Sequence, residues 1–164
     1  MKQTLIALME DNPGVLDRVA SLFRCRNFNI DSLTVGHSET SGISRMTLVV
    51  DCDDEVQKEQ VVKQFRKLIE VTKVIEDVTP DRAVYRELAL IKVSAGIETR
   101  SAVIQLVDVF RAQVIDVAPT SMTIEITGAE DKVDSFVSLL RPFGIREMGR
   151  TGRVAMLRGV NGKQ

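Results

Sequence analysis

The chain has little of what most catalytic sites need. Its 164 residues contain no tryptophan, one tyrosine, one histidine and two cysteines. The single histidine, His37, lies in a polar segment between two predicted strands, without the partners that would orient it in a catalytic triad. The sequence also has no P-loop, no zinc-ligand spacing and no dinucleotide-binding fingerprint. We therefore expect no catalytic site, no metal site and no bound cofactor in this chain.

Long apolar runs are also missing. The longest run near the N-terminus, Leu5 to Met9, is too short for a signal-peptide core or a membrane span. The two cysteines, Cys25 and Cys52, are expected to be free thiols. We therefore expect a cytoplasmic protein that does not enter a membrane.

The composition that is present, 44% apolar and 27% charged, is typical of a folded globular protein. In the first half, alternating and helical apolar spacings predict a strand, a helix, two strands joined as a hairpin, a second helix capped by Asp53 or Asp54, and a fourth strand. In order, these strands are 4–10, 28–35, 43–51 and 71–78, and the first helix is 14–26.

The same order begins again after Pro80 and Asp81. The spacing predicts strands at 86–93, 113–117 and 121–127, helices at 99–110 and 130–140, and short closing strands at 145–148 and 154–157. The fold class is therefore α+β, with two ferredoxin-like (βαββαβ) domains in tandem, 1–79 and 80–164. Because apolar side chains also point away from the helices in both repeats, we expect each open sheet face to meet another domain or chain, and at least a dimer.

The segment between the first strand and the first helix carries the clearest functional signal. Pro13 suits a first helical turn, and Gly14 lets a ligand approach the backbone without meeting a Cβ. Free N–H groups at the helix start favour an anion, while the neighbouring polar residues offer acceptors for an ammonium group. The pattern favours an amino acid as ligand, although such a turn can also simply connect two elements. The second repeat lacks the turn, so we expect one binding site per chain.

At this point the residues resemble a known family. Residues 10–19, 26–35 and 44–47 are similar to the small, regulatory subunit of acetolactate synthase (acetohydroxyacid synthase). A turn like that at 11–16 alone would indicate only an ACT-type ligand-binding domain. The run from Asn29 to Val35 makes the resemblance specific.

The resemblance implies an N-terminal ACT domain, a C-terminal ACT-like domain and no catalysis by the chain itself. It implies a homodimer that associates with a large catalytic subunit, which carries thiamine diphosphate, magnesium and FAD. It further implies a role in branched-chain amino acid biosynthesis, in which the small subunit activates the large one and confers feedback inhibition by valine, with leucine or isoleucine as further possible effectors.

The resemblance also implies which residues bind the effector, at a seam where two ACT domains pair edge to edge. One chain contributes Asp11, Asn12, Gly14, Val15 and Leu16, and its neighbour contributes Asn29 and Ile30. Some relatives have asparagine in place of Asp11, so this chain carries an extra negative charge at that position. Our hypothesis is that the N–H groups of residues 14–16 hold the effector's carboxylate, Asp11 and Asn29 hold its ammonium group, and apolar residues, with Val35 among the candidates, enclose its side chain.

Two other classes share parts of this pattern. RNA-recognition domains have the same βαββαβ order, but they present aromatic side chains on their central strands, and residues 44–50 have none. Together with a formal net charge of −1, this argues against a nucleic-acid partner. An ACT-domain amino-acid sensor that regulates another enzyme remains the alternative.

Overall fold

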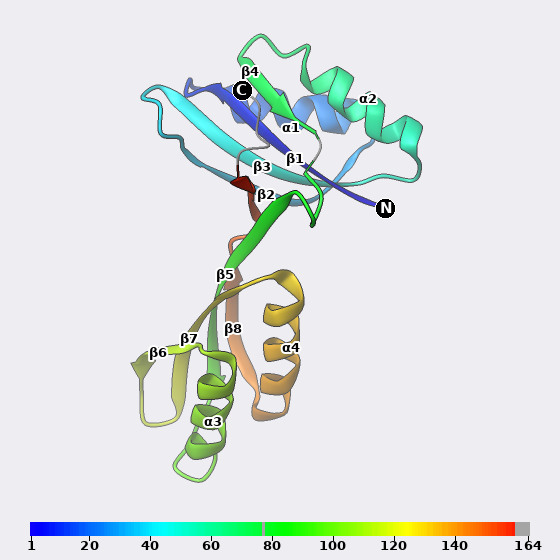
Figure 1. Ribbon diagram of the computed structural model, residues 1–164. Coiled ribbons are helices and arrows are strands. Elements are labelled where there is room, and N and C mark those ends of the chain that lie inside the picture. The colour runs from blue at the N-terminus through cyan, green and yellow to red at the C-terminus, as the bar shows by residue number, and fades with distance from the viewer. Residues whose placement is uncertain (77, 160–164) are drawn as a thin grey trace. The chain divides into compact units, whose positions relative to one another are not determined.

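The computed structural model describes residues 1–76 and 78–159, and the chain divides into two units. The first comprises Met1–Val84 together with the C-terminal segment that begins at Arg153, and the second comprises Tyr85–Gly152. Two expectations extend beyond the described residues, because the predicted strand 71–78 includes residue 77 and the predicted second domain includes 160–164. Each unit contains one βαββαβ repeat, as predicted (Figure 1).

The first unit is a four-stranded antiparallel sheet in the order β2-β3-β1-β4, with its two helices on one face (Figure 1). Its elements are β1 (Lys2–Glu10), α1 (Val15–Cys25), β2 (Asn29–His37), β3 (Ile43–Asp51), α2 (Glu55–Phe65) and β4 (Val71–Ile75). The expected cap of α2 is Asp54, whose side chain accepts a hydrogen bond from the amide of Gln57 at 2.8 Å.

The core of this unit lies between the sheet and its helices. Alternate residues of β1 and β3 point towards the helices because successive side chains in a strand face opposite ways. On α1, Val15, Val19 and Phe23 recur every four residues and form the buried stripe. The rings of Phe23 and Phe65 meet edge to face, with centroids 5.9 Å apart, which joins the two helices over the sheet.

A short strand near the C-terminus, β9 (Val154–Leu157), is held by side chains of the first sheet. We call residues 153–157 the C-terminal strap. It pairs with β5, and four hydrogen bonds join it to β1, β2 and β3: Arg153 N to Ser32 Oγ (3.1 Å), Arg153 Nη1 to Thr4 Oγ1 (3.0 Å), Ala155 N to Thr47 Oγ1 (3.5 Å) and Arg45 Nη2 to the Ala155 carbonyl (2.9 Å). The face away from the helices therefore meets the strap, a segment that we assigned to the second domain and that belongs to the first unit.

The second unit is an antiparallel sheet in the order β6-β7-β5-β8, again with both helices on one face (Figure 1). Its elements are β5 (Ala83–Ser94), whose first two residues belong to the first unit, α3 (Arg100–Phe110), β6 (Gln113–Val117), β7 (Ser121–Gly128), α4 (Glu130–Leu140), a 3-10 turn (Arg141–Phe143) and β8 (Ile145–Arg150). Arg150 forms ion pairs with Asp134 and with Glu87, whose side chain is 7% exposed.

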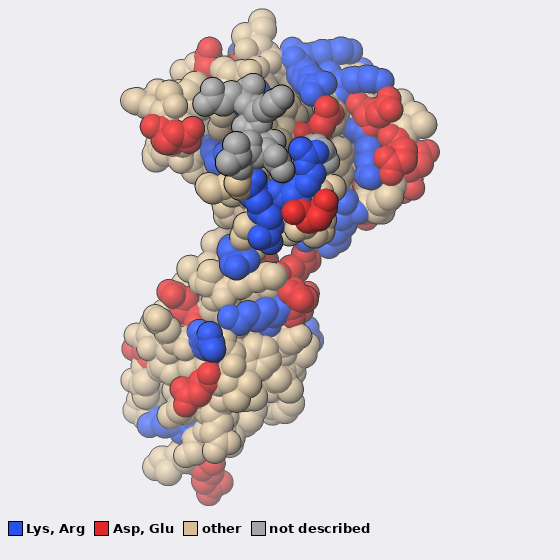
Figure 2. All heavy atoms as spheres, in the orientation of Figure 1, with Lys and Arg blue, Asp and Glu red and all other residues tan. Residues whose placement is uncertain are grey.

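Helix α2 of the first unit carries side chains of both charges on its surface. Figure 2 shows acidic and basic side chains next to one another over α2. The ion pairs of α2 are Lys58 with Glu55 at 2.8 Å and Lys63 with Glu59 at 2.9 Å. Among the described residues, no helix is long and apolar enough to span a membrane.

Candidate functional site

A pocket of about 350 Å³ lies under the N-terminal end of α1. It contains all five turn residues that we expected from one chain, namely Asp11, Asn12, Gly14, Val15 and Leu16. Its other lining residues are Met9, Glu10, Pro13, Asp17, Val35 and Ser44. The pocket is large enough for a small amino acid, since a typical ligand site starts at roughly 300 Å³.

The helix end above the pocket is open. Gly14 has φ 87° and ψ −5°, a left-handed conformation that places α1 over the turn, and no side chain caps the helix. The amide of Val15 points to the Asn12 carbonyl, with an N···O distance of 3.4 Å, and the amide of Arg18 bonds the Gly14 carbonyl at 3.1 Å. The amides of Leu16 and Asp17 have no partner in the part of the chain that the structure describes. Among the described residues, the amides of Gly14, Leu16 and Asp17 are therefore the donors available to an anion, whereas the amide of Val15 is directed to Asn12.

Carboxylates surround the mouth of this pocket. Glu10, Asp11 and Asp17 line it, and no lysine or arginine does. Two of the carboxylates have local partners: Asn12 Nδ2 donates to Glu10 Oε2 at 2.9 Å, and His37 Nδ1 lies 3.5 Å from Asp11 Oδ2. A ligand that carries a cationic group as well as an anionic one fits this combination of acidic side chains and backbone donors.

The floor of the pocket comes from three strands. Met9 on β1 pairs with Ser44 on β3, and Val35 on β2 pairs with Met46, so all of them face the helix side of the sheet. Val35 was already a candidate, whereas sequence reasoning missed Met9 and Ser44 as site residues. The signal was the position of Ser44 within an otherwise apolar alternation, but only the strand register shows which residue it faces.

Asn29 and Ile30 are not in this pocket. Asn29 begins β2 and pairs with Asp51, whereas the end of β2, at His37, pairs with Ser44 beside the pocket. Eight residues of extended strand separate the two ends of β2, a distance of about 26 Å at 3.3 Å per residue. Within one chain, therefore, the structure brings together five of the seven expected residues and leaves two at the opposite end of the sheet.

The second unit lacks this turn, as expected, and the corresponding segment is closed: Thr99, before α3, is not left-handed (φ −101°). The two repeats can be aligned by one hydrogen bond. The amide of Asp11 bonds the carbonyl of Gly42 at 2.9 Å, and the amide of Ala95 bonds the carbonyl of Thr120 at 3.0 Å. In both repeats the acceptor immediately precedes the third strand. Arg100 follows Gly96 by four residues, and its Nη2 donates to the carbonyls of Ala95, Ala118 and Pro119.

Arg100 is the first residue of α3, whereas the first residue of α1 is Val15, so the first unit has no arginine at this position. Arg18, four residues after Gly14, bonds Glu70 instead. The first turn therefore stays open, while an arginine of the chain itself fills the corresponding segment of the second unit.

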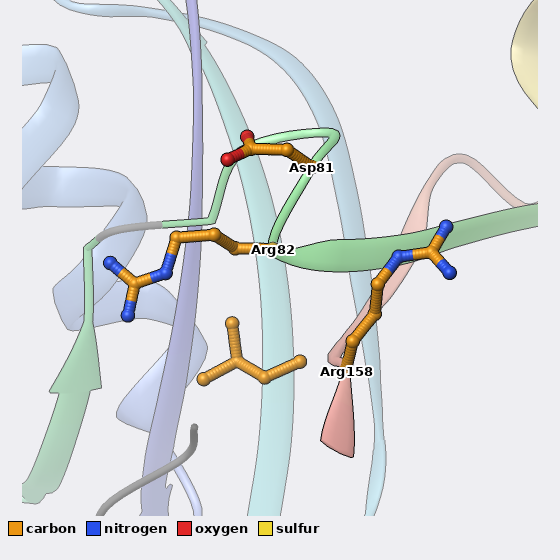
Figure 3. A pocket seen from close by; sticks show the side chains of 4 residues that line it. Asp81, Arg82 and Arg158 are labelled. Carbon is orange, nitrogen blue, oxygen red and sulfur yellow. The ribbon is translucent and has the colours of Figure 1, made fainter. Parts of the chain in front are cut away.

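Another hollow in the first unit has two arginines at its rim but does not form an anion site. It is lined by Asp81, Arg82, Leu157 and Arg158. Figure 3 shows that the guanidinium groups of Arg82 and Arg158 point away from each other, so they do not converge on one ligand. Among the described residues, no cluster of histidine, cysteine, aspartate and glutamate side chains has the geometry to hold a metal ion.

The chain has two ferredoxin-like units in tandem, and the first has an open helix end above a small pocket. These features place it in the class of tandem ACT-domain proteins. Residues 5–73 match the "AHAS small subunit-like ACT domain", and residues 86–159 match the "Small subunit of acetolactate synthase". A protein of Archaeoglobus fulgidus named "Probable acetolactate synthase small subunit" is 54% identical over 159 residues, covering 97% of this chain and 98% of its own length. The chain belongs to the family of acetolactate synthase small subunits.

Two further relatives support this assignment over the whole chain. The acetolactate synthase small subunit of Mycobacterium bovis is 51% identical, with 97% of this chain and 94% of that protein covered. The crystal structure of the small subunit from Thermotoga maritima superposes with a TM-score of 0.91 at 45% identity, covering 98% of this chain and 99% of that one. The two-unit fold is therefore shared by the family.

Proposed function

We propose that the chain is the regulatory subunit of acetolactate synthase, and that it binds and activates a large catalytic subunit and makes it sensitive to valine. Membership of the small-subunit family supports the partner, and the pocket under α1 supports the effector. On this proposal the thiamine diphosphate, magnesium and FAD belong to the large subunit, and both proteins act in the cytoplasm, in branched-chain amino acid synthesis.

The observation that carries the effector proposal is the uncapped start of α1 above a pocket with an apolar floor. The free backbone amides and the positive end of the helix dipole would bind the effector's carboxylate. The carboxylate of Asp11 would bind its ammonium group. Leu16, Val35 and Met9 offer apolar contacts to a branched side chain, and one methylene changes affinity in such a pocket by only about 1–3 kcal/mol. Leucine and isoleucine would therefore bind as well, with different affinities.

A second copy of the chain would complete this site. In the described part of the sheet, β2 pairs on one side only, with β3, and is an edge strand. Two β2 strands pairing antiparallel would place the start of one beside the end of the other. Asn29 and Ile30 of the second copy would then lie near the pocket of the first. This pairing explains how residues at opposite ends of β2 can serve one ligand.

Inhibition would follow from the position of the ligand between two chains. An effector bound at the seam stabilises one arrangement of the dimer, and it inhibits if the large subunit is less active with that arrangement. A coupling free energy of about 1–3 kcal/mol would be sufficient, since it changes an affinity by roughly 5- to 150-fold.

The test is to reconstitute the chain with the large subunit from the same organism and measure acetolactate formation. We expect a complex, a higher rate with the small subunit than without it, and inhibition by valine. Gly14→Asp adds a negative charge where the effector's carboxylate would bind, so this variant should still form the complex and activate but lose valine inhibition.

Gly149→Asp is the matched control. An added Cβ at either glycine meets no atom within 4 Å, but Gly149 lies on β8 of the second unit and is not one of the residues that line the pocket. Normal valine inhibition of the Gly14→Asp complex would refute the placement of the effector. Failure to form any complex would instead favour an ACT-domain sensor that regulates another enzyme.

A further inference from the structure

Ser44 is a buried polar residue on the floor of the pocket. It is the second residue of β3, it is 7% exposed, and it lines the pocket on the helix side of the sheet. In the described part of the chain, its hydroxyl group has no hydrogen-bond partner. The hydroxyl oxygen is not one of the fully buried side-chain atoms without a partner, so it is open to the pocket, where a ligand can reach it. Polar side chains at buried positions usually have a bonding partner.

The second repeat shows what packing alone selects at this position. Met122 is the second residue of β7, as Ser44 is of β3, and it pairs with Val93 as Ser44 pairs with Met9. Met122 is 1% exposed and belongs to the apolar core of its unit. Where an arginine closes the corresponding segment, this position is apolar. Where the turn is open, the position carries a hydroxyl group that faces the pocket.

The other lining residues offer the effector's carboxylate backbone donors but no free cationic side chain. No lysine or arginine lines the pocket, the side-chain amide of Asn12 donates to Glu10, and the Val15 amide is directed to Asn12. Among the described residues, the unengaged donors are the amides of Gly14, Leu16 and Asp17 at the helix end and the hydroxyl group of Ser44 on the floor. Ser44 is therefore the side chain that can add a donor from the floor of the pocket, across from the end of α1.

We propose that the Ser44 hydroxyl donates a hydrogen bond to the effector's carboxylate, which makes Ser44 a specificity-determining residue of the pocket. This inference rests on the proposed function, since it deepens the account of the same site. It assigns to Ser44 the recognition of a free carboxylate, as opposed to an amide or an alcohol at the same carbon. A hydrogen bond to a charged group is stronger than one to a neutral group, so the preference for the acid should depend on this hydroxyl.

Calorimetric titration of the full chain with valine and with valinamide, which lacks the carboxylate, tests this role. We expect Ser44→Ala to weaken valine binding by about tenfold or more, as for loss of a hydrogen bond to a charged group. Valinamide should bind the unaltered chain more weakly than valine, and Ser44→Ala should change its affinity little. Ser44→Thr keeps the hydroxyl group and should retain valine binding, whereas Ser44→Met introduces the residue of the second repeat and should fold but not bind.

Ser121→Ala is the matched control, because Ser121 is also buried, at 9% exposed, but lies in the second unit. It should bind valine as the unaltered chain does. Equal valine affinities of the unaltered chain and Ser44→Ala would overturn the role of Ser44 and leave the proposed function standing. Equal losses for valine and valinamide would also overturn it, because they would show an effect on packing. No valine binding by the unaltered chain would refute the proposed effector itself.

Discussion

The left-handed conformation of Gly14 allows a quantitative test of the turn. Gly14→Ala should destabilise the first unit because an L-residue at φ 87° is strained, at a cost of about 1–2 kcal/mol. An alanine Cβ at this position meets no atom within 4 Å, so no steric clash adds to this cost. Alanine also restricts the unfolded chain, which offsets the strain by about 0.4–1 kcal/mol. The net loss should therefore be about 1 kcal/mol.

Gly36→Ala is the control for this prediction. Gly36 lies in β2 of the same unit, it does not have a left-handed φ, and an added Cβ again meets no atom within 4 Å. Only the favourable effect on the unfolded chain should remain, so this variant should be as stable as the original or gain up to about 1 kcal/mol. The two variants should differ by about 1–2 kcal/mol.

Urea unfolding followed by circular dichroism measures this difference, and thermal unfolding should show it as a difference of roughly 2–8 °C in Tm, at about 2–4 °C per kcal/mol for a chain of this size. If Gly14→Ala proved as stable as Gly36→Ala, the left-handed turn would not be present in solution, and the open helix end that depends on it would be in doubt.

Two further predictions concern buried groups. Arg150→Met leaves the Glu87 carboxylate buried without its cationic partner and should cost the second unit about 3 kcal/mol in urea unfolding, whereas Lys92→Met, at an exposed ion pair, should cost less than 1 kcal/mol. Equal costs would contradict this account of the buried pair. Burial raises the pKa of the Cys52 thiol, so at about pH 8 a thiol reagent should modify the exposed Cys25 first and Cys52 only on unfolding; rapid modification of both would contradict the packing of Cys52.

The sequence allowed the elements to be predicted because their signals are local. Alternation along 43–51 and the four-residue spacing of Val15, Val19 and Phe23 each arise within one element, and the structure confirms the strand and the helix. The five turn residues of the pocket were also predictable, because they are contiguous in the chain.

Features that join distant segments were not predictable in the same way. Ser44 became a site residue only through its pairing with Met9, and the C-terminal strap depends on bonds such as that between Arg45 and Ala155, which are 110 residues apart. No periodicity within either segment encodes such a bond. The place of Asn29 in the site came from the resemblance, and within one chain this residue lies at the far end of β2.

The arginine in the second unit determines how many amino-acid sites each chain can have. Arg100 supplies, from inside the chain, a cation for the backbone oxygens that surround it, so that repeat has no vacancy to offer a zwitterion. The fold is therefore repeated within the chain, but the ligand-binding site is not. A saturating titration should therefore level off at one equivalent of amino acid per polypeptide, which is two molecules rather than four for the proposed dimer.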